Sequence, residues 1–228
     1  MSRIFQIGFN RCGTTSFYNF FKKNRIPSLH WNRGSIAAGI KAAHLSNKPL
    51  LSLVEGFTFY SDMEYVDIIH AGEWISELQF QELFKQQNRD DFLPIYGYEM
   101  FAELDKQYPN SKFILNTRDV DNWINSRLRF LKSGYEYCKH GHRFHDNEEE
   151  LKLCWKEHWH SHYNSVIDYF KDRPHDLLIF NIESDDPVKI VDFFANLELK
   201  IEHWGHHNKS RGNQGDFSKA EWVDYQID

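Results

Sequence analysis

Cysteine and proline are both scarce in this sequence. Its 228 residues include three cysteines, at positions 12, 138 and 154, too few and too widely spaced for the disulfide framework of a small secreted domain. With six prolines, the chain also has no linker rich in proline, glycine or serine that would divide it. We therefore expect one domain over residues 1–228, because this length suits one sizeable core better than two.

Long hydrophobic runs are missing as well. No stretch approaches the roughly 18 apolar residues that indicate a membrane-spanning helix. The apolar segment Ile4–Ile7 starts almost at the first residue and leaves no room for the charged and apolar regions of a signal peptide. Together with the low cysteine content, these absences predict a cytoplasmic protein that does not span a membrane.

Nor does the chain carry an excess of positive charge. Its 33 acidic residues outnumber the 27 Lys and Arg, which gives a net charge of -6. A general nucleic-acid-binding protein needs a basic field to displace counterions from phosphates, so we expect no nucleic-acid partner. A local basic cleft can still bind a small anion. Nothing in the sequence indicates an oligomeric state.

What the sequence does contain is an alternation of strand-like and helix-like segments. Short apolar segments predict strands at Arg3–Ile7, Ile26–His30, Leu50–Phe59, Lys112–Thr117 and Leu177–Asn181. Apolar residues at helical spacing predict helices at Thr14–Asn24, Ser35–Asn47, Tyr98–Tyr108, Val120–Lys132, Glu148–Phe170 and Pro187–Leu197. This order predicts an α/β fold with a central, mostly parallel sheet flanked by helices. The segments around residues 31–97 and 134–162 are irregular or helical, and we expect them to form the substrate side.

The first predicted strand leads into a loop with the spacing of a phosphate-binding turn. The segment Gly8–Ser16 reads GFNRCGTTS, with four residues between two glycines and hydroxyl residues after the second. Between a strand and a helix, such glycines permit a tight turn, and successive N–H groups point at the anion. The lysine of a Walker A loop is replaced by Thr14, and a cation stands inside the loop at Arg11. This suits a donor without a γ-phosphate and a reaction without Mg²⁺, so we expect no metal.

These residues resemble the 5′-phosphosulfate loop of the PAPS-dependent sulfotransferases, in which a Lys or Arg precedes x-Gly-Thr-Thr. PAPS is 3′-phosphoadenosine 5′-phosphosulfate. A second signature of that family is an Arg at the end of a central strand with a Ser eight residues later, and Arg118 and Ser126 have that spacing. The resemblance implies a P-loop, nucleotide-kinase-like fold and transfer of a sulfuryl group from PAPS, with PAP as the product. The acceptor that it implies is a hydroxyl or amine of a small molecule, a lipid or a glycan.

The resemblance also implies roles for individual residues. Arg11 would contact the bridging oxygen and the leaving phosphate, and Arg118 and Ser126 would bind the 3′-phosphate. The residues placed around the 5′-phosphate are Cys12, Gly13, Thr14, Thr15 and Ser16. In the family, a late loop rich in Lys, Arg and Gly closes over the 3′-phosphate. Lys209 and Arg211 either form that loop here or belong to a solvated charge cluster.

The general base for a hydroxyl acceptor is less well defined by the sequence. His30 is the first candidate, because it ends the second predicted strand at the edge where α/β active sites collect and because histidine titrates near neutral pH. Asp62 and Glu55 are the alternatives. His30 stands next to Trp31, so a packed, hydrogen-bonded histidine without a catalytic role is the competing interpretation.

Two other functions remain open from the sequence. One is a small-molecule kinase with a degenerate P-loop, against which the missing Walker lysine argues. The other is a protein that binds PAP or PAPS without catalysis, which the undefined base leaves open. The histidines between His140 and His162 lack the H-E-x-x-H pattern and a companion cysteine or acid in register, so we expect no metal there.

Overall fold

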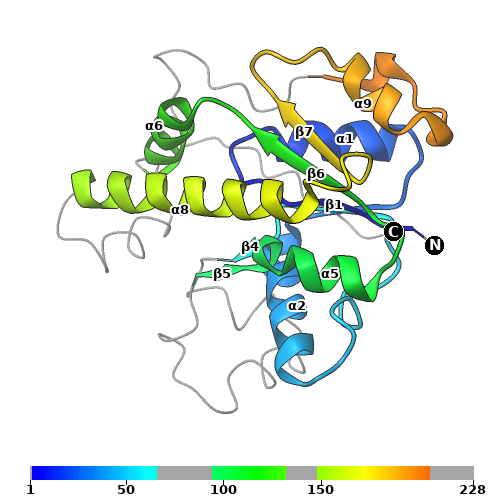
Figure 1. Cartoon of the computed structure of the whole chain (residues 1–228), viewed down its shortest axis with the longest axis horizontal. Helices are drawn as coiled ribbons and strands as arrows, with labels where there is room; N and C mark the ends of the chain where they lie inside the picture. Colours follow the sequence, from blue (N-terminus) through cyan, green and yellow to red (C-terminus); the bar gives the residue numbers. More distant parts are fainter. Residues whose placement is uncertain (1, 66–93, 132–147, 206–228) are drawn as a thin grey trace.

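The computed structural model describes residues 2–65, 94–131 and 148–205. Within them, five parallel strands form one sheet in the order β2-β3-β1-β6-β7, and Figure 1 labels β1, β6 and β7 of this sheet. The strands are β1 (Ile4–Gln6), β2 (Ser28–His30), β3 (Phe59–Ser61), β6 (Lys112–Thr117) and β7 (Leu177–Asn181). The predicted α/β class with a central, mostly parallel sheet is confirmed.

The strand order places a ligand crevice at the carboxyl end of β1. This strand is central, and its Ile4 pairs with Phe59 of β3 on one side and with Lys112 of β6 on the other. The chain builds the β2–β3 half of the sheet first and then continues on the opposite side with β6 and β7. Connections that leave a central strand in opposite directions open a crevice beyond its carboxyl end, where ligands of such sheets bind.

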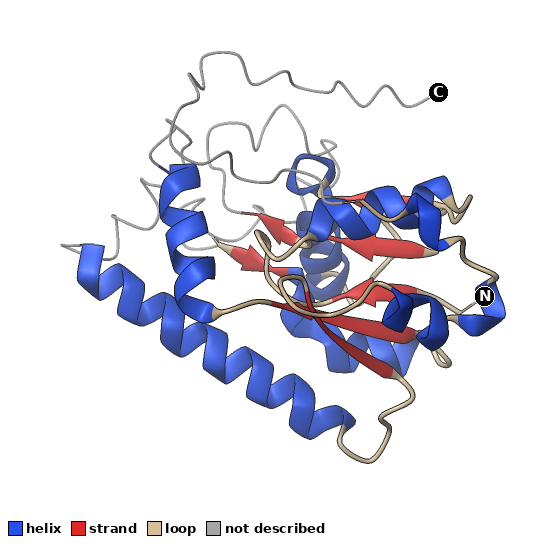
Figure 2. Ribbon diagram, turned by 90° about the horizontal axis from the view of Figure 1, so that it is seen from above, coloured by secondary structure: helices blue, strands red, loops and turns tan. Residues whose placement is uncertain are grey.

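Helices cover both faces of the sheet (Figures 1 and 2). The helices of one face are α1 (Thr14–Lys23) and α9 (Val188–Phe193), and those of the other face are α2 (Ser35–Leu45), α5 (Phe101–Gln107) and the long α8 (Glu148–Phe170). The remaining helix, α6 (Val120–Leu131), follows β6 and packs against α8. The fold therefore has three layers, with the sheet in the middle.

Side chains alternate between the two faces along each strand. On β6, Phe113 and Leu115 pack toward the α8 side, whereas Ile114 packs toward the α1 side. All three are fully buried, as expected for parallel strands that are covered on both faces. On α1, Phe17 and Phe21 stand four residues apart and pack into the same cluster as Ile114, because this spacing places them on one face of the helix.

The prediction of a strand over Leu50–Phe59 is wrong for most of its length. Residues 50–58 form turns and bends, and β3 begins only at the last residue of the predicted segment. Within the turns, the Val54 N–H donates to the Leu51 carbonyl oxygen at 2.9 Å. Leu51 is buried by this turn as fully as a strand would bury it, so an apolar run alone does not separate the two conformations.

Several short elements complete the described structure. An antiparallel pair joins β4 (Glu64–Tyr65) to β5 (Ile95–Tyr96). The 3-10 turns are η1 (Asn32–Gly34), η3 (Gly97–Met100), η4 (Ala195–Leu197) and η5 (Ile201–His203). Of the segment around residues 134–162 that was expected on the substrate side, the part up to residue 147 lies outside the described residues and the rest belongs to α8. In the part of the chain that the structure describes, no helix is both long enough and apolar enough to cross a membrane.

Candidate active site

The loop after β1 needs glycine at both ends. A Cβ atom on Gly8 would lie 2.2 Å from the Asn116 carbonyl oxygen in β6, far inside van der Waals contact. Gly13 has a φ of 82° in the left-handed region, and a Cβ atom there would lie 2.7 Å from Ile182 Cδ1. A close approach at one end and a left-handed turn at the other therefore shape the loop between strand and helix.

A buried asparagine of β6 holds the loop from inside. The Asn116 Oδ1 atom accepts a hydrogen bond from the Gly8 N–H at 3.1 Å. Its Nδ2 atom donates to the carbonyl oxygens of Phe9, at 3.0 Å, and Cys12, at 3.1 Å. A loop whose carbonyl oxygens are held from within presents peptide N–H groups on its other side, which is the arrangement that binds an anion.

Helices α6 and α8 support the same loop. The Trp123 indole N–H of α6 donates to the Asn10 carbonyl oxygen at 3.1 Å. On α8, His162 Nε2 lies 2.7 Å from the Ile7 carbonyl oxygen, which requires the proton of the ring to be on Nε2. Burial lowers the pKa of His162 below its ordinary value, so this ring stays neutral. His162 therefore supports the loop as a structural donor.

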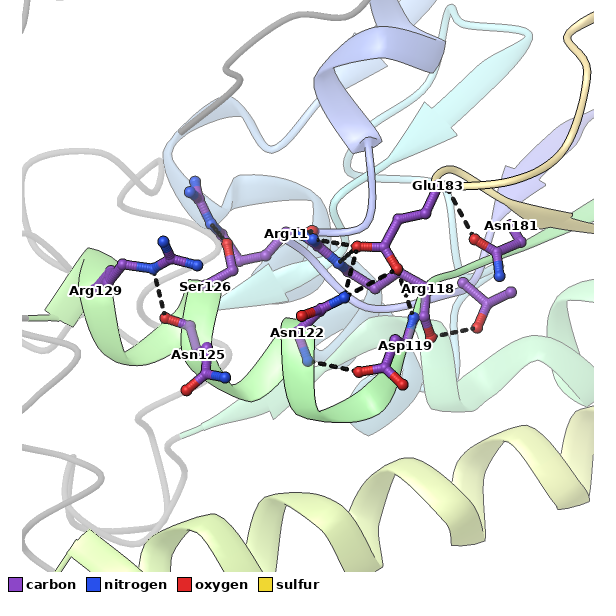
Figure 3. A network of polar contacts seen from close by, with 10 residues as sticks. Arg11, Arg118, Asp119, Asn122, Asn125, Ser126, Arg129, Asn181 and Glu183 are labelled. Carbon is purple, nitrogen blue, oxygen red and sulfur yellow. Dashed lines mark hydrogen bonds and ion pairs between the residues drawn. The ribbon is translucent and has the colours of Figure 1, made fainter. Parts of the chain in front are cut away.

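Three residues that the resemblance assigns to the nucleotide lie together. Arg11 has a φ of 61° and directs its Nε atom to Ser126 Oγ on α6, at 3.3 Å. Arg118, which follows β6, donates from Nη1 to the Arg11 carbonyl oxygen at 3.1 Å. The loop and the distant Arg–Ser pair thus form one contiguous site at the carboxyl ends of β1 and β6 (Figure 3).

Glu183, which follows β7, completes this network, and the sequence reasoning missed it. Its Oε1 atom accepts hydrogen bonds from Arg118 Nε at 3.1 Å, from Arg118 Nη2 at 2.5 Å and from Asn122 Nδ2 at 3.2 Å. Its Oε2 atom accepts one from the Asp119 N–H at 3.0 Å. Burial acts to raise the pKa of this carboxyl, but the hydrogen bonds from Asp119 and Arg118 bring it below its ordinary value. The signal in the sequence is an acid two residues after a predicted strand.

His30 and Asp62 lie on the other side of the loop. The pairing of β2 with β3 places His30 opposite Ser61, and His30 Nδ1 lies 2.9 Å from Ser61 Oγ. The Nε2 atom faces the loop, 3.5 Å from Thr15 Oγ1 and 3.8 Å from Asp62 Oδ2. Asp62 Oδ2 in turn lies 3.5 Å from Thr14 Oγ1. Two of the three candidate bases, His30 and Asp62, therefore border the threonines that begin α1.

Burial shifts the pKa values of the two candidate bases in opposite directions. It lowers the pKa of His30 to about 4, so the ring is uncharged at neutral pH and can accept a proton. Burial, followed by the charge of Glu64, raises the pKa of Asp62 to about 7 against the opposing effects of Arg11 and Thr14. Near neutral pH, Asp62 is therefore protonated part of the time, whereas His30 is not.

Replacing Asp62 with asparagine is expected to stabilise the fold at neutral pH. The folded pKa of about 7 lies above the ordinary value of 3.8, so the folded protein binds this proton more tightly than the unfolded chain does. As the pH rises from 3.8 to about 7, the carboxyl of the unfolded chain ionises first and the folded state loses stability. A shift of this size corresponds to roughly 4 kcal/mol. Urea denaturation should show a higher free energy of unfolding for Asp62→Asn than for the parent protein at pH 7, and this difference should nearly vanish at pH 4. An equal difference at both pH values would contradict the raised pKa of Asp62.

The other candidates contribute less to this arrangement. Glu55 precedes β3 and lies toward the amino ends of the strands, at the edge of the sheet opposite the loop. Cys12 is buried, and burial raises the pKa of its thiol, so it offers the loop its main chain and not a thiolate. Lys209 and Arg211 lie outside the described residues. Among the residues that are described, no three His, Cys, Asp or Glu side chains are grouped so that they could hold a metal ion.

A protein-family model described as a sulfotransferase domain matches residues 3–139, more than half of the 228-residue chain. The match includes the loop, the three candidate bases and the Arg118–Ser126 pair, and it ends before α8 and β7. No curated protein matches the chain.

Proposed function

The chain belongs to the sulfotransferase family, and from this premise we propose that it takes a sulfuryl group from PAPS, bound at the loop Gly8–Ser16, and passes it to a hydroxyl or amine. Sulfuryl transfer follows from the family itself. The donor, the roles of the residues and the acceptor class, which is a small molecule, a lipid or a glycan, are the parts that we propose.

The donor assignment is supported by the contact between the loop and the Arg118–Ser126 pair. PAPS carries a phosphosulfate on the 5′ side of its ribose and a phosphate on the 3′ side, so a protein that binds it needs two neighbouring anion sites. The loop offers one of them, and the Arg–Ser pair offers the other. Arg11 belongs to both, because its carbonyl oxygen contacts Arg118 and its side chain contacts Ser126.

The proposed reaction is an in-line displacement at sulfur. The acceptor oxygen or nitrogen attacks the sulfur atom, the bond between sulfur and the phosphate oxygen breaks, and its electron pair leaves with PAP. Arg11 and the N–H groups of the loop stabilise the charge that develops on the bridging oxygen and the leaving phosphate. The proton of the acceptor goes to the base, so the products are the sulfated acceptor, PAP and the protonated base.

We assign the base to His30. Its ring is neutral at working pH, because its pKa is about 4, and its Nε2 atom lies 3.5 Å from Thr15 Oγ1 in the proposed phosphosulfate site. The Ser61 hydroxyl at Nδ1 holds the orientation of the ring. Asp62, 3.8 Å from Nε2, stabilises the imidazolium once Asp62 has itself ionised.

Thermal shifts with PAP, AMP and ADP test the donor assignment. A ligand that binds only the folded state raises Tm, and we expect the largest shift with PAP, because AMP and ADP lack the 3′-phosphate. Arg118→Ala is expected to weaken PAP binding roughly 10- to 100-fold by removing a charged phosphate ligand. Arg173→Ala is the matched control, since Arg173 pairs with Asp105 at 2.7 Å and lies away from the loop.

The same assay separates the competing functions. Equal shifts with PAP and AMP in the parent protein would contradict the PAPS donor. A preference for ADP in the presence of Mg²⁺ would favour a small-molecule kinase. Tight PAP binding without transfer to any member of a broad acceptor panel would favour a binding protein without catalysis.

A further inference from the structure

We propose that Glu183 is the positioning residue of the 3′-phosphate site and fixes the Arg118 guanidinium so that the protein distinguishes PAP from AMP. This inference rests on the proposed PAPS donor and deepens it. Glu183 lies outside the matched sulfotransferase segment, residues 3–139, and neither the loop pattern nor the Arg–Ser spacing includes it.

The main chain of Glu183 is itself held in place. Its N–H donates to Asn181 Oδ1 at 2.9 Å. The Asn181 N–H donates to Asp185 Oδ2, also at 2.9 Å. These bonds brace the turn between β7 and α9. The Glu183 carboxylate therefore projects toward Arg118 from a fixed turn (Figure 3). That turn follows β7, the strand that pairs with β6.

The Glu183 carboxylate joins three residues that surround the end of β6. It accepts hydrogen bonds from the Arg118 guanidinium, the Asp119 N–H and the Asn122 side chain. Asp119 also caps α6, because its Oδ1 atom accepts the Asn122 N–H at 2.8 Å. Ser126, the second proposed ligand of the 3′-phosphate, lies one helical turn after Asn122 in α6. Glu183 thus braces both sides of the proposed site.

The hydrogen bonds of Arg118 leave part of its guanidinium for an anion. A guanidinium has five N–H groups. Glu183 accepts from Nε and from one N–H of Nη2, and the Arg11 carbonyl oxygen accepts from one N–H of Nη1. The second N–H of each Nη atom has no partner within the described part of the chain. Two N–H groups on one fixed guanidinium are the donors that a phosphate takes.

A carboxylate beside a phosphate-binding arginine can act in two opposite ways. It can compete with the phosphate for the guanidinium, or it can hold the guanidinium ready for the phosphate. Glu183 fits the second role, because Asp119 and Asn122 also bond its oxygens, so it has no need to move when a phosphate arrives. The Arg118 side chain is 21% exposed, and without Glu183 it would lose more rotamer freedom on binding. Loss of Glu183 should then weaken PAP binding even though it removes a nearby negative charge.

Calorimetric titration of the full chain with PAP and AMP tests this role. Glu183→Ala is expected to raise the Kd for PAP about tenfold, by analogy with the loss of residues that orient the ligands of a metal ion, and to leave the Kd for AMP unchanged. Glu183→Gln should give an intermediate loss, because an amide keeps one acceptor oxygen. In an Arg118→Ala background, Glu183→Ala should have no further effect, since Glu183 acts through Arg118.

Asp186→Asn is the matched control for the turn. It removes a carboxylate three residues away and keeps an oxygen that can accept the Val188 N–H, and Asp186 makes no contact with Arg118 in the described structure. An unchanged or lower Kd for PAP in both Glu183 variants overturns the proposal, and so does an equal loss in Asp186→Asn. If the parent protein does not prefer PAP to AMP, the PAPS donor fails and this inference fails with it. If the parent does prefer PAP and the Glu183 variants match it, only the role of Glu183 is lost.

Discussion

Replacing Arg11 with alanine is expected to abolish detectable sulfuryl transfer, a loss of at least about 10²- to 10³-fold in kcat/KM. Arg11 lies inside the loop that is proposed to hold the phosphosulfate, and it is the side chain assigned to the bridging oxygen as the sulfur–oxygen bond breaks. A group that acts in the transition state lowers kcat and kcat/KM together when it is removed. The measurement is PAP release with any acceptor that the parent protein sulfates in a panel.

Two further variants separate catalysis from general loss of charge. Arg11→Lys keeps the charge but loses the planar fork of donors, so we expect partial activity. Arg173→Ala should transfer at nearly the rate of the parent, because that guanidinium pairs with Asp105 away from the loop. A parent-like rate in Arg11→Ala at saturating PAPS would contradict the catalytic role.

Replacing His30 with alanine is expected to lower kcat about 10²- to 10⁴-fold, the usual contribution of general base catalysis. PAP binding should change much less than kcat, because His30 does not contact Arg118 or Ser126 in the described structure and reaches the 5′-phosphate site only through Thr15. The measurements are kcat at saturating PAPS and the PAP thermal shift of the same variant. Loss of PAP binding in step with kcat would show that His30 serves the nucleotide site and not the acceptor.

The pH dependence of kcat distinguishes His30 from Asp62 as the base. With a pKa of about 4, His30 stays unprotonated over the working range. Ionisation of Asp62, which has a pKa of about 7, then raises kcat by no more than about tenfold, because it places a negative charge beside the imidazolium. If Asp62 is the base, kcat falls about tenfold for each pH unit below 7, and Asp62→Asn is inactive. If kcat of the parent protein falls about tenfold for each pH unit below 7, Asp62 and not His30 is the base.

The parts of the site that can be predicted from the sequence are those with a fixed spacing along the chain. The loop needs two glycines at a set distance between a strand and a helix, and the structure confirms this strand–loop–helix unit between β1 and α1. Arg118 and Ser126 have a similar local spacing, from the end of a strand to the next helix. Their roles toward a nucleotide remain predictions that the experiments above decide.

The parts that depend on strand order could not be predicted in the same way. Glu183 and Arg118 are 65 residues apart, and an acid after a strand resembles any exposed loop acid until β7 is placed beside β6. His30 and Asp62 come together because β2 pairs with β3, and the predicted strand over Leu50–Phe59 ends before Asp62. Residues 50–58 include buried apolar side chains but form turns and bends, so the sequence pattern placed the strand too early and did not reveal that β3 ends next to Asp62.

A crystal structure of the protein with PAP would decide whether the loop and the Arg118–Ser126 pair bind this nucleotide. We expect the 5′-phosphate against the N–H groups of the loop Gly8–Ser16, with the 3′-phosphate between Arg118 and Ser126 and Glu183 still bonded to Arg118. A nucleotide bound elsewhere, or one whose 3′-phosphate has no contact with Arg118, would contradict it.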